Sequence, residues 1–126
     1  MTEDAISARV AVPSELPGGL EARRSGHFGR CECFTVVDLV DGEISAVATL
    51  ENAPHVDGGC MTPVIALARH RVNAIVVDGI GGRPLQGFNQ VGIAVHAGVG
   101  DDVASAVREF AAGRLPLVGL DGACRH

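Results

Sequence analysis

Residues 33–50, CFTVVDLVDGEISAVATL, decide the fold, because two apolar runs flank Asp41-Gly42. Val, Phe and Thr favour strands, and Asp-Gly between two such runs is a strong signal for a two-residue hairpin turn. We therefore predict antiparallel strands over residues 33–40 and 43–50. Because side chains alternate along a strand, the second strand should carry one apolar face. That face consists of Ile44, Ala46, Ala48 and Leu50.

The rest of the chain alternates strand and helix patterns. Residues 8–12 alternate in character, which predicts a short strand that Pro13 ends. After the hairpin, Thr62 followed by Pro63 is a favoured helix start. The remaining predicted elements are a strand over residues 73–77, a helix over 84–88, a strand over 92–96, and a helix that Asp101 caps and Gly113 ends.

This order of elements predicts an α/β fold. A hairpin followed by alternating helices and strands forms a mixed sheet, here of five strands, with helices on its faces. We expect a single three-layer domain over residues 8–115, with flexible termini at 1–7 and 116–126.

The composition narrows the class of protein. With 126 residues, 47% hydrophobic and 20% charged, the chain resembles an ordinary soluble domain. A net charge of −5 argues against a nucleic-acid or membrane-surface binder. No apolar stretch approaches the roughly 20 residues that span a bilayer, and residues 1–7 lack the apolar segment of a signal peptide. We therefore expect a cytoplasmic protein whose four cysteines stay reduced or bind metal.

Metal-ligand residue types gather in two irregular segments, around SGHFGRCECF and PHVDGGCMTP. Thiolates with imidazoles suit soft or borderline ions and iron–sulfur species. Both segments lie at strand ends, where loops of an α/β sheet can converge on one edge. The candidate metal ligands are His27, Cys31, Cys33, His55 and Cys60. For Cys33, which opens a strand, a small buried thiol is an equally good interpretation.

A glycine-rich turn over residues 79–84, GIGGRP, is a second candidate site. Backbone N–H groups at a helix start can hold an anion, and Arg83 would add a guanidinium. The alternative is a tight turn that needs glycine for its backbone angles alone. The chain shows no recognisable catalytic set, which favours a function other than catalysis.

Several of these motifs together resemble the dinitrogenase iron–molybdenum cofactor biosynthesis family, the NifX-type domain also found at the end of some cofactor-assembly proteins. The match runs in order over about residues 8–115. The segments that carry it are RVAVP at 9–13, GHFGR at 26–30, NAPH at 52–55, GGC at 58–60, GIGGRPL at 79–85 and FAAG at 110–113.

The resemblance implies a ribonuclease-H-like sheet and a non-enzymatic role. Family members with assigned roles bind iron–molybdenum cofactor or its iron–sulfur precursor and pass it on. By analogy, His27 is the best-matched ligand, while Arg30 and Arg83, with Gly81 and Gly82 of the turn, would hold an anionic cluster. Members vary at the three cysteine positions, so the thiol ligands are specific to this chain.

The leading hypothesis is therefore a binding or carrier protein for an iron–sulfur or iron–molybdenum-type cluster, with a cofactor-assembly protein as partner and neither nucleic acid nor membrane. One alternative is a structural zinc or mononuclear metal site in an interaction module. Another is a small-anion binder, or an unrecognised enzyme, built on the GIGGRP turn.

Overall fold

The computed structural model describes residues 7–25, 31–51, 61–78, 80, 82–98 and 100–118. The elements in chain order are β1 (Ala8–Ser14), β2 (Cys33–Val40), β3 (Glu43–Glu51), α1 (Met61–Arg69), β4 (Ala74–Val77), α2 (Gly82–Val91), β5 (Ala94–Ala97) and α3 (Val103–Ala111).

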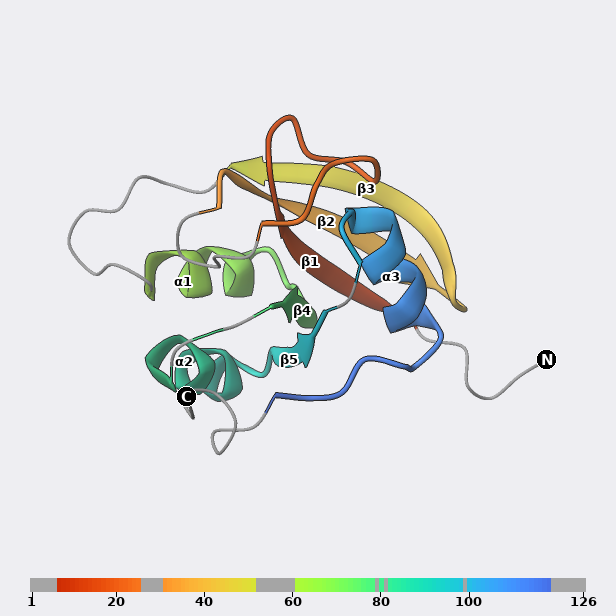
Figure 1. Cartoon of the computed structure of the whole chain (residues 1–126). Helices are drawn as coiled ribbons and strands as arrows, with labels where there is room; N and C mark the ends of the chain where they lie inside the picture. Colours follow the sequence, from red (N-terminus) through yellow and green to blue (C-terminus); the bar gives the residue numbers. More distant parts are fainter. Residues whose placement is uncertain are drawn as a thin grey trace.

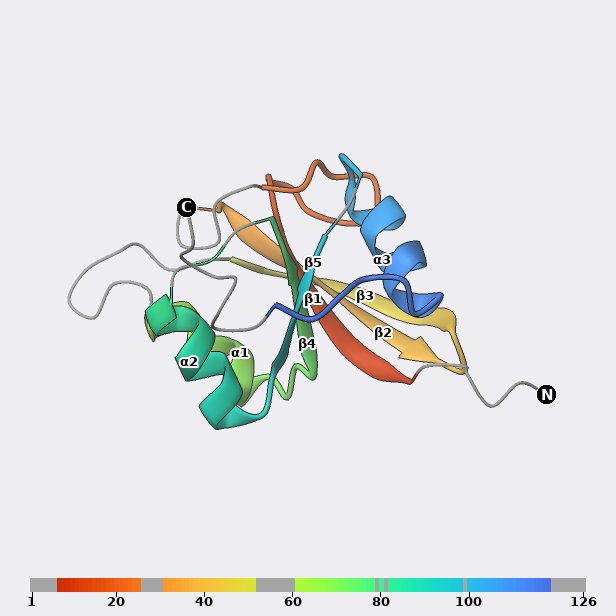
Figure 2. The same ribbon diagram turned by 60° about the horizontal axis from the view of Figure 1, so that its bottom comes forward.

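The strands form one five-stranded sheet in the order β3-β2-β1-β4-β5. Strand β2 is antiparallel to both β1 and β3, whereas β4 is parallel to both β1 and β5. Helices α1 and α2 lie on one face of the sheet and α3 lies on the other (Figures 1 and 2). The predicted single-domain, mixed α/β architecture is confirmed. The relation to ribonuclease H stays a prediction.

Two apolar clusters hold the three layers together. Strand β1 contributes to both, because alternate residues face opposite sides of the sheet. Ala11 packs with Phe34 of β2 beneath α1 and α2, while Val10 and Val12 pack beneath α3. The α3 residues of the second cluster are Val103, Ala106, Val107 and Phe110. Each fully buried Val or Phe stabilises the fold by about 1.5–3 kcal/mol.

The first strand is longer than predicted. It continues through Pro13, which pairs with Phe34, to Ser14. The parallel pairing with β4 involves only Val10 and Ala11, so Pro13 lies beyond that ladder. A proline is tolerated where no neighbouring strand requires its N–H. The prediction that Pro13 ends the strand is therefore wrong.

The hairpin forms where Asp41-Gly42 predicts it, but the side chain of Ile44 lies on the opposite face of β3 from the one predicted. The register shifts so that Asp38 pairs with Ala46 while Leu39 pairs with Ile44, which leaves Ser45 as the extra residue of a β-bulge. Ala46, Ala48 and Leu50 share a face as expected. Ile44 does not join them, because the bulge reverses the alternation.

The helix boundaries also differ from the pattern. Helix α1 begins at Met61, so Thr62 lies inside it rather than at its cap. Helix α2 runs over Gly82–Val91, well beyond the predicted residues 84–88. The cap of α3 is Asp102, not Asp101, and its carboxylate accepts a 2.8 Å hydrogen bond from the Ser105 N–H. Adjacent aspartates give the sequence no means of choosing between them.

The segment after α3 covers the outer edge of β5. The Ala97 N–H donates to the Pro116 carbonyl at 2.9 Å, and the Val118 N–H donates to the Val95 carbonyl at 2.8 Å. Residues 116–118 of the predicted flexible terminus are thus paired with the sheet, and this strand edge is closed by the chain's own backbone.

Candidate functional site

The described residues that flank the predicted ligand segments lie at the carboxyl-terminal edge of the sheet, where β1, β3 and β4 end and β2 begins. The Ser25 N–H donates to the Pro13 carbonyl near the end of β1. At the same edge, Glu51 at the end of β3 pairs with Cys33 at the start of β2. Asp78 follows β4, which runs parallel to β1 (Figure 1). The segments 26–30, 52–60 and 79–81 therefore connect residues at a single edge, as the strand-end argument predicts.

Most of the candidate ligands lie outside the described residues. These are His27, Arg30, His55, Cys60 and Gly81, together with the side chain of Arg83. Gly82 is the first residue of α2, so the glycine turn does lead into a helix start. The roles assigned to these residues stay predictions.

The structure places Cys31 and Cys33 on opposite sides of the sheet. Cys31 is 5% exposed and belongs to the apolar cluster beneath α1 and α2. Cys33 is fully buried, and its Sγ donates to the carbonyl oxygens of Ser14 at 3.7 Å and Glu15 at 3.6 Å. The two thiols are therefore not brought together at one point. Among the described residues, no group of three or more His, Cys, Asp or Glu is arranged to hold a metal ion.

The surroundings of Cys33 favour its protonated form. Burial raises the pKa of its thiol, and the negative charges of Glu32 and Glu51 raise that pKa further. A metal binds the thiolate, so it would have to displace the thiol proton, which two carbonyl oxygens share. These surroundings suit the interpretation of Cys33 as a buried structural thiol.

Arg24 is a residue at this edge that the sequence analysis did not single out. Its side chain is 5% exposed, and Nη2 donates to the Asp78 carboxylate at 2.7 Å. Nη2 and Nε also donate to the Gly100 carbonyl, at 2.8 and 3.1 Å. Arg24 thus joins the loop after β1 to the turns that follow β4 and β5.

The remaining nitrogen of this guanidinium, Nη1, is buried and has no hydrogen bond within the described ranges. It lies so close to Gly98 that a Cβ there would be 2.7 Å from Nη1. No local pattern marks such a residue, since its partners lie 54 and 76 positions away in sequence.

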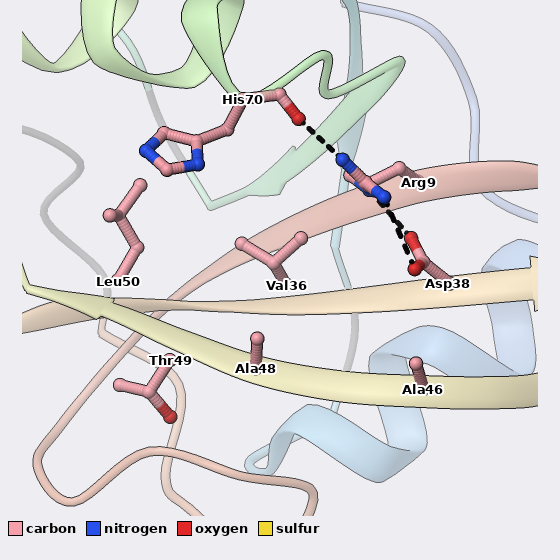
Figure 3. Close-up of a pocket in the computed structure, with 8 residues that line it drawn as sticks. All are labelled: Arg9, Val36, Asp38, Ala46, Ala48, Thr49, Leu50 and His70. Atoms are coloured by element: carbon pink, nitrogen blue, oxygen red, sulfur yellow. Dashed lines mark hydrogen bonds and ion pairs between the residues drawn. The ribbon is translucent and has the colours of Figure 1, made fainter.

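A separate groove lies on the face of β2 and β3 that carries Val36, beside the C-terminal end of α1 (Figure 3). It has a volume of about 240 Å³. The lining residues are Arg9, Val36, Asp38, Ala46, Ala48, Thr49, Leu50 and His70. Its floor is apolar and built largely from small side chains.

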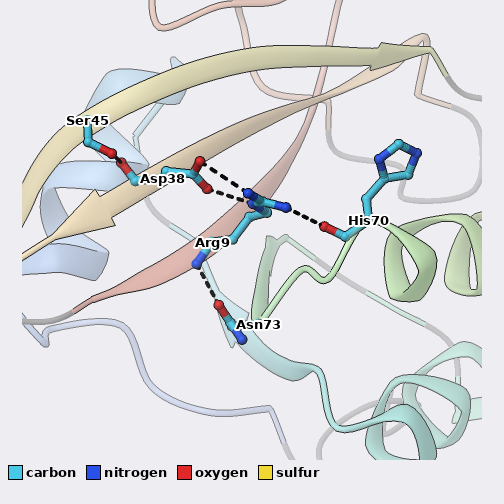
Figure 4. Close-up of polar contacts among 5 residues, drawn as sticks. All are labelled: Arg9, Asp38, Ser45, His70 and Asn73. Carbon is cyan, nitrogen blue, oxygen red and sulfur yellow. Dashed lines mark hydrogen bonds and ion pairs between the residues drawn. The ribbon is translucent and has the colours of Figure 1, made fainter.

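At the polar end of this groove, the charged side chains already pair with each other and with a main-chain carbonyl (Figure 4). Arg9 donates to Asp38 at 2.7 and 3.3 Å and to the His70 carbonyl at 2.7 Å. The Asp38 contact raises the pKa of the Arg9 guanidinium. Because the Asp38 carboxylate balances the positive charge of Arg9, the cation at this end of the groove is already neutralised within the protein.

Comparison with known proteins identifies the family. Residues 7–113 match the model of a family described as dinitrogenase iron-molybdenum cofactor. The chain belongs to this family. The family is associated with cofactor biosynthesis and is not a known catalytic one. Among the helices that the structure describes, none combines the length and apolar character needed to cross a bilayer.

Relatives support the same assignment. An uncharacterized protein from Methanocaldococcus jannaschii is 35% identical over 109 residues, covering 85% of this chain and 88% of that protein. The apo form of the orange protein from Desulfovibrio gigas superposes with a TM-score of 0.78 at 26% identity, covering 91% of this chain and 96% of that one. A candidate NifB protein from Thermotoga has a TM-score of 0.71 at 28% identity, covering 87% and 92%.

Proposed function

We propose that this protein binds an iron–sulfur or iron–molybdenum-type cluster and carries it, in the cytoplasm, to a cofactor-assembly protein. Membership of the cofactor family over residues 7–113 is the observation that carries the proposal. The described residues that flank the ligand-rich segments lie at one edge of the sheet, which supports it. In this role the protein holds and releases its cargo without catalysing a reaction.

The proposed ligands come from the two segments that end at this edge. His27, His55 and Cys60 supply imidazole and thiolate groups, and Cys31 supplies a further thiol from the neighbouring residues. Arg30 and Arg83, with the backbone of Gly81 and Gly82, balance the negative charge of the cluster. We leave Cys33 out of the ligand set, because its buried thiol donates to the main-chain carbonyls of Ser14 and Glu15.

The test is anaerobic purification with quantitation of iron, zinc, molybdenum and acid-labile sulfide, alongside a visible absorption spectrum. We expect iron and sulfide in comparable amounts, either as purified or after reconstitution. Cys60→Ala and His27→Ala should lose both. Cys33→Ala is the matched thiol control and should retain them, with folding checked by circular dichroism.

Two outcomes would contradict the proposal and favour its alternatives. Zinc without sulfide would indicate a mononuclear metal site in an interaction module. A metal-free protein that fails reconstitution, and that phosphorylated ligands stabilise against heat, would indicate an anion binder at the glycine turn. Retention of iron by both Cys60→Ala and His27→Ala would remove the proposed ligand set.

A further inference from the structure

A second depression adjoins the groove on β2 and β3, and the ion pair of Arg9 with Asp38 lines both. Figure 4 shows Ser45 next to Asp38 and Asn73 next to Arg9. The polar residues of the second depression are Ser7, Arg9, Asp38, Ser45, Arg71 and Asn73. The ion pair is therefore the boundary between an apolar surface and a polar one.

Arg9 does not use all of its hydrogen-bond donors within the protein. A guanidinium has five N–H groups, and those of Arg9 make three contacts, two to Asp38 and one to the His70 carbonyl. No further acceptor for them lies among the described residues, and the side chain is 40% exposed. Two N–H groups are thus available to an acceptor from outside the protein.

The local charge favours a ligand with a single negative charge. The charges of Arg9 and Asp38 cancel, and Arg71 makes no ion pair with any described residue. The depressions therefore keep the positive charge of Arg71, in a chain whose net charge is −5. Because the Asp38 carboxylate lies close by and repels a second negative charge, a carboxylate fits better than a phosphate dianion.

The backbone at Arg71 supports a role for its side chain. Arg71 follows α1 with a φ of 62°, and its N–H donates to the Ala68 carbonyl at 3.0 Å. Glycine is the usual residue at this position after a helix, because a side chain strains the left-handed backbone. Arg69, in the last turn of α1, already places a cation at the helix end. The strained arginine is therefore better explained by what its guanidinium binds.

The apolar part of the site is shaped for one flat ring. Across the two strands, Asp38 pairs with Ala46 and Val36 pairs with Ala48, and both alanines are exposed. Figure 3 shows His70 and Leu50 at the end of this alanine floor that lies away from Asp38. An apolar cavity of about 150 Å³ holds benzene. The groove, at about 240 Å³, accommodates a single ring with a short chain.

We propose that this groove binds a small aromatic carboxylate. The ring packs on Ala46 and Ala48 beside the His70 imidazole, as aromatic rings commonly pack. The carboxylate accepts from the remaining N–H groups of Arg9 and from Arg71, in charge-assisted hydrogen bonds. All of these residues belong to the described part of the chain and lie outside the proposed cluster ligands. The site can therefore be measured on the metal-free protein.

Titration of the metal-free protein with phenylacetate, followed by amide NMR shifts, tests the proposal. We expect saturable shifts at Ala46, Ala48 and Arg71, with a Kd of about 1 mM or below. Phenylacetamide keeps the ring without the charge, and acetate keeps the charge without the ring. Each should bind about tenfold more weakly than phenylacetate, because each lacks one half of the contacts.

Two substitutions separate the two halves of the site. Arg71→Gly removes the guanidinium and relieves the backbone, so it should fold and bind phenylacetate about tenfold more weakly. Arg69→Gln removes the same charge from a residue that lines neither depression, so it is the matched control and should bind like the wild type. Ala48→Leu fills the groove and should abolish binding, with folding checked by circular dichroism.

Three results would overturn the proposal. The first is the absence of saturable shifts in the groove up to about 10 mM phenylacetate. The second is an equal loss of affinity in Arg71→Gly and Arg69→Gln, which would indicate general charge attraction. The third is an Ala48→Leu variant that binds like the wild type. If Ala48→Leu fails to fold, Ala46→Leu repeats this test at the neighbouring floor position.

Discussion

The guanidinium of Arg24 donates a 2.7 Å hydrogen bond to the carboxylate of Asp78, a residue 54 positions away in the sequence. Arg24 follows β1 and Asp78 follows β4, and the same guanidinium reaches the Gly100 carbonyl after β5. One side chain therefore fixes three loops at the edge where the proposed cargo site lies.

Replacing Arg24 with Ala should destabilise the protein by about 1–3 kcal/mol, because a buried side chain and its contacts to Asp78 and Gly100 are lost together. Urea unfolding measures the change. The neighbouring Arg23 is exposed, so Arg23→Ala should change stability by less than about 0.5 kcal/mol. Equal losses of stability from the two substitutions would show that the contacts of Arg24 do not stabilise the fold.

Gly98→Ala should also destabilise the fold, by about 1–3 kcal/mol. The added Cβ would lie 2.6 Å from Val76 Cγ1 and 2.7 Å from Arg24 Nη1, and both atoms belong to packed side chains. Thermal unfolding measures the loss. In the Arg24→Ala background one of the two clashes disappears, so Gly98→Ala should be less harmful there. An unchanged effect would place the whole strain at Val76.

Cys33 should make stability fall in alkaline solution. Its pKa is raised by burial and by Glu32 and Glu51, so folding favours the protonated thiol. That stabilisation is fully present below the ordinary thiol pKa and is lost as the pH rises through the raised pKa. The chain contains neither Lys nor Tyr, which leaves the thiols as the only side chains titrating between about pH 8 and 11.

Unfolding free energies measured across this alkaline range, for the wild type and Cys33→Ala, isolate this contribution. The substitution should flatten the decline in stability with pH. A decline of the same steepness in Cys33→Ala would assign the effect to the other thiols.

The cap of α3 should make stability fall in acid. The hydrogen bond from Ser105 holds the pKa of the Asp102 carboxyl below its ordinary value. The resulting stabilisation is present above the ordinary carboxyl range and is lost as the pH falls through the lowered pKa. Asp102→Asn keeps a capping oxygen without the charge, so it should remain folded at neutral pH with a weaker acid dependence.

Melting temperatures at several acidic pH values distinguish these contributions. Asp102→Ala should melt lower than Asp102→Asn at neutral pH, because alanine provides no cap. Asp101→Ala is the control and should behave like the wild type. A melting temperature that falls as much in Asp101→Ala as in Asp102→Ala would contradict the assignment of the cap.

Features with a local cause in the sequence could be predicted, whereas features that depend on residues far apart in the sequence could not. The hairpin at Asp41-Gly42 and the alternating order of elements have local causes, so sequence patterns reveal them. The bulge at Ser45 has no local mark, because it depends on how β3 aligns with β2. The strand continues through Pro13 because β4 pairs only further back.

The candidate site also has features that the sequence predicts and features that depend on distant contacts. The strand ends that flank the ligand-rich segments lie at one edge of the sheet, and this follows from the order of elements. The separation of Cys31 and Cys33 on two sides of the sheet could not be predicted, because it depends on how the residues just before β2 pack against the helices. The role of Arg24 depends on three loops distant in sequence. The ligand roles of His27, His55 and Cys60 remain predictions for metal analysis to test.

The short segment over residues 116–118 has a consequence for how far sheets can grow. With β5 covered, the outer side of β3 is the sheet edge that no described element pairs with. A chain cut at residue 113, where the family match stops, would expose the β5 edge as well. Contacts between unlike edges repeat without closing, and they generate filaments rather than pairs. These few residues therefore cover one of the two unlike edges that open-ended growth of the sheet would require.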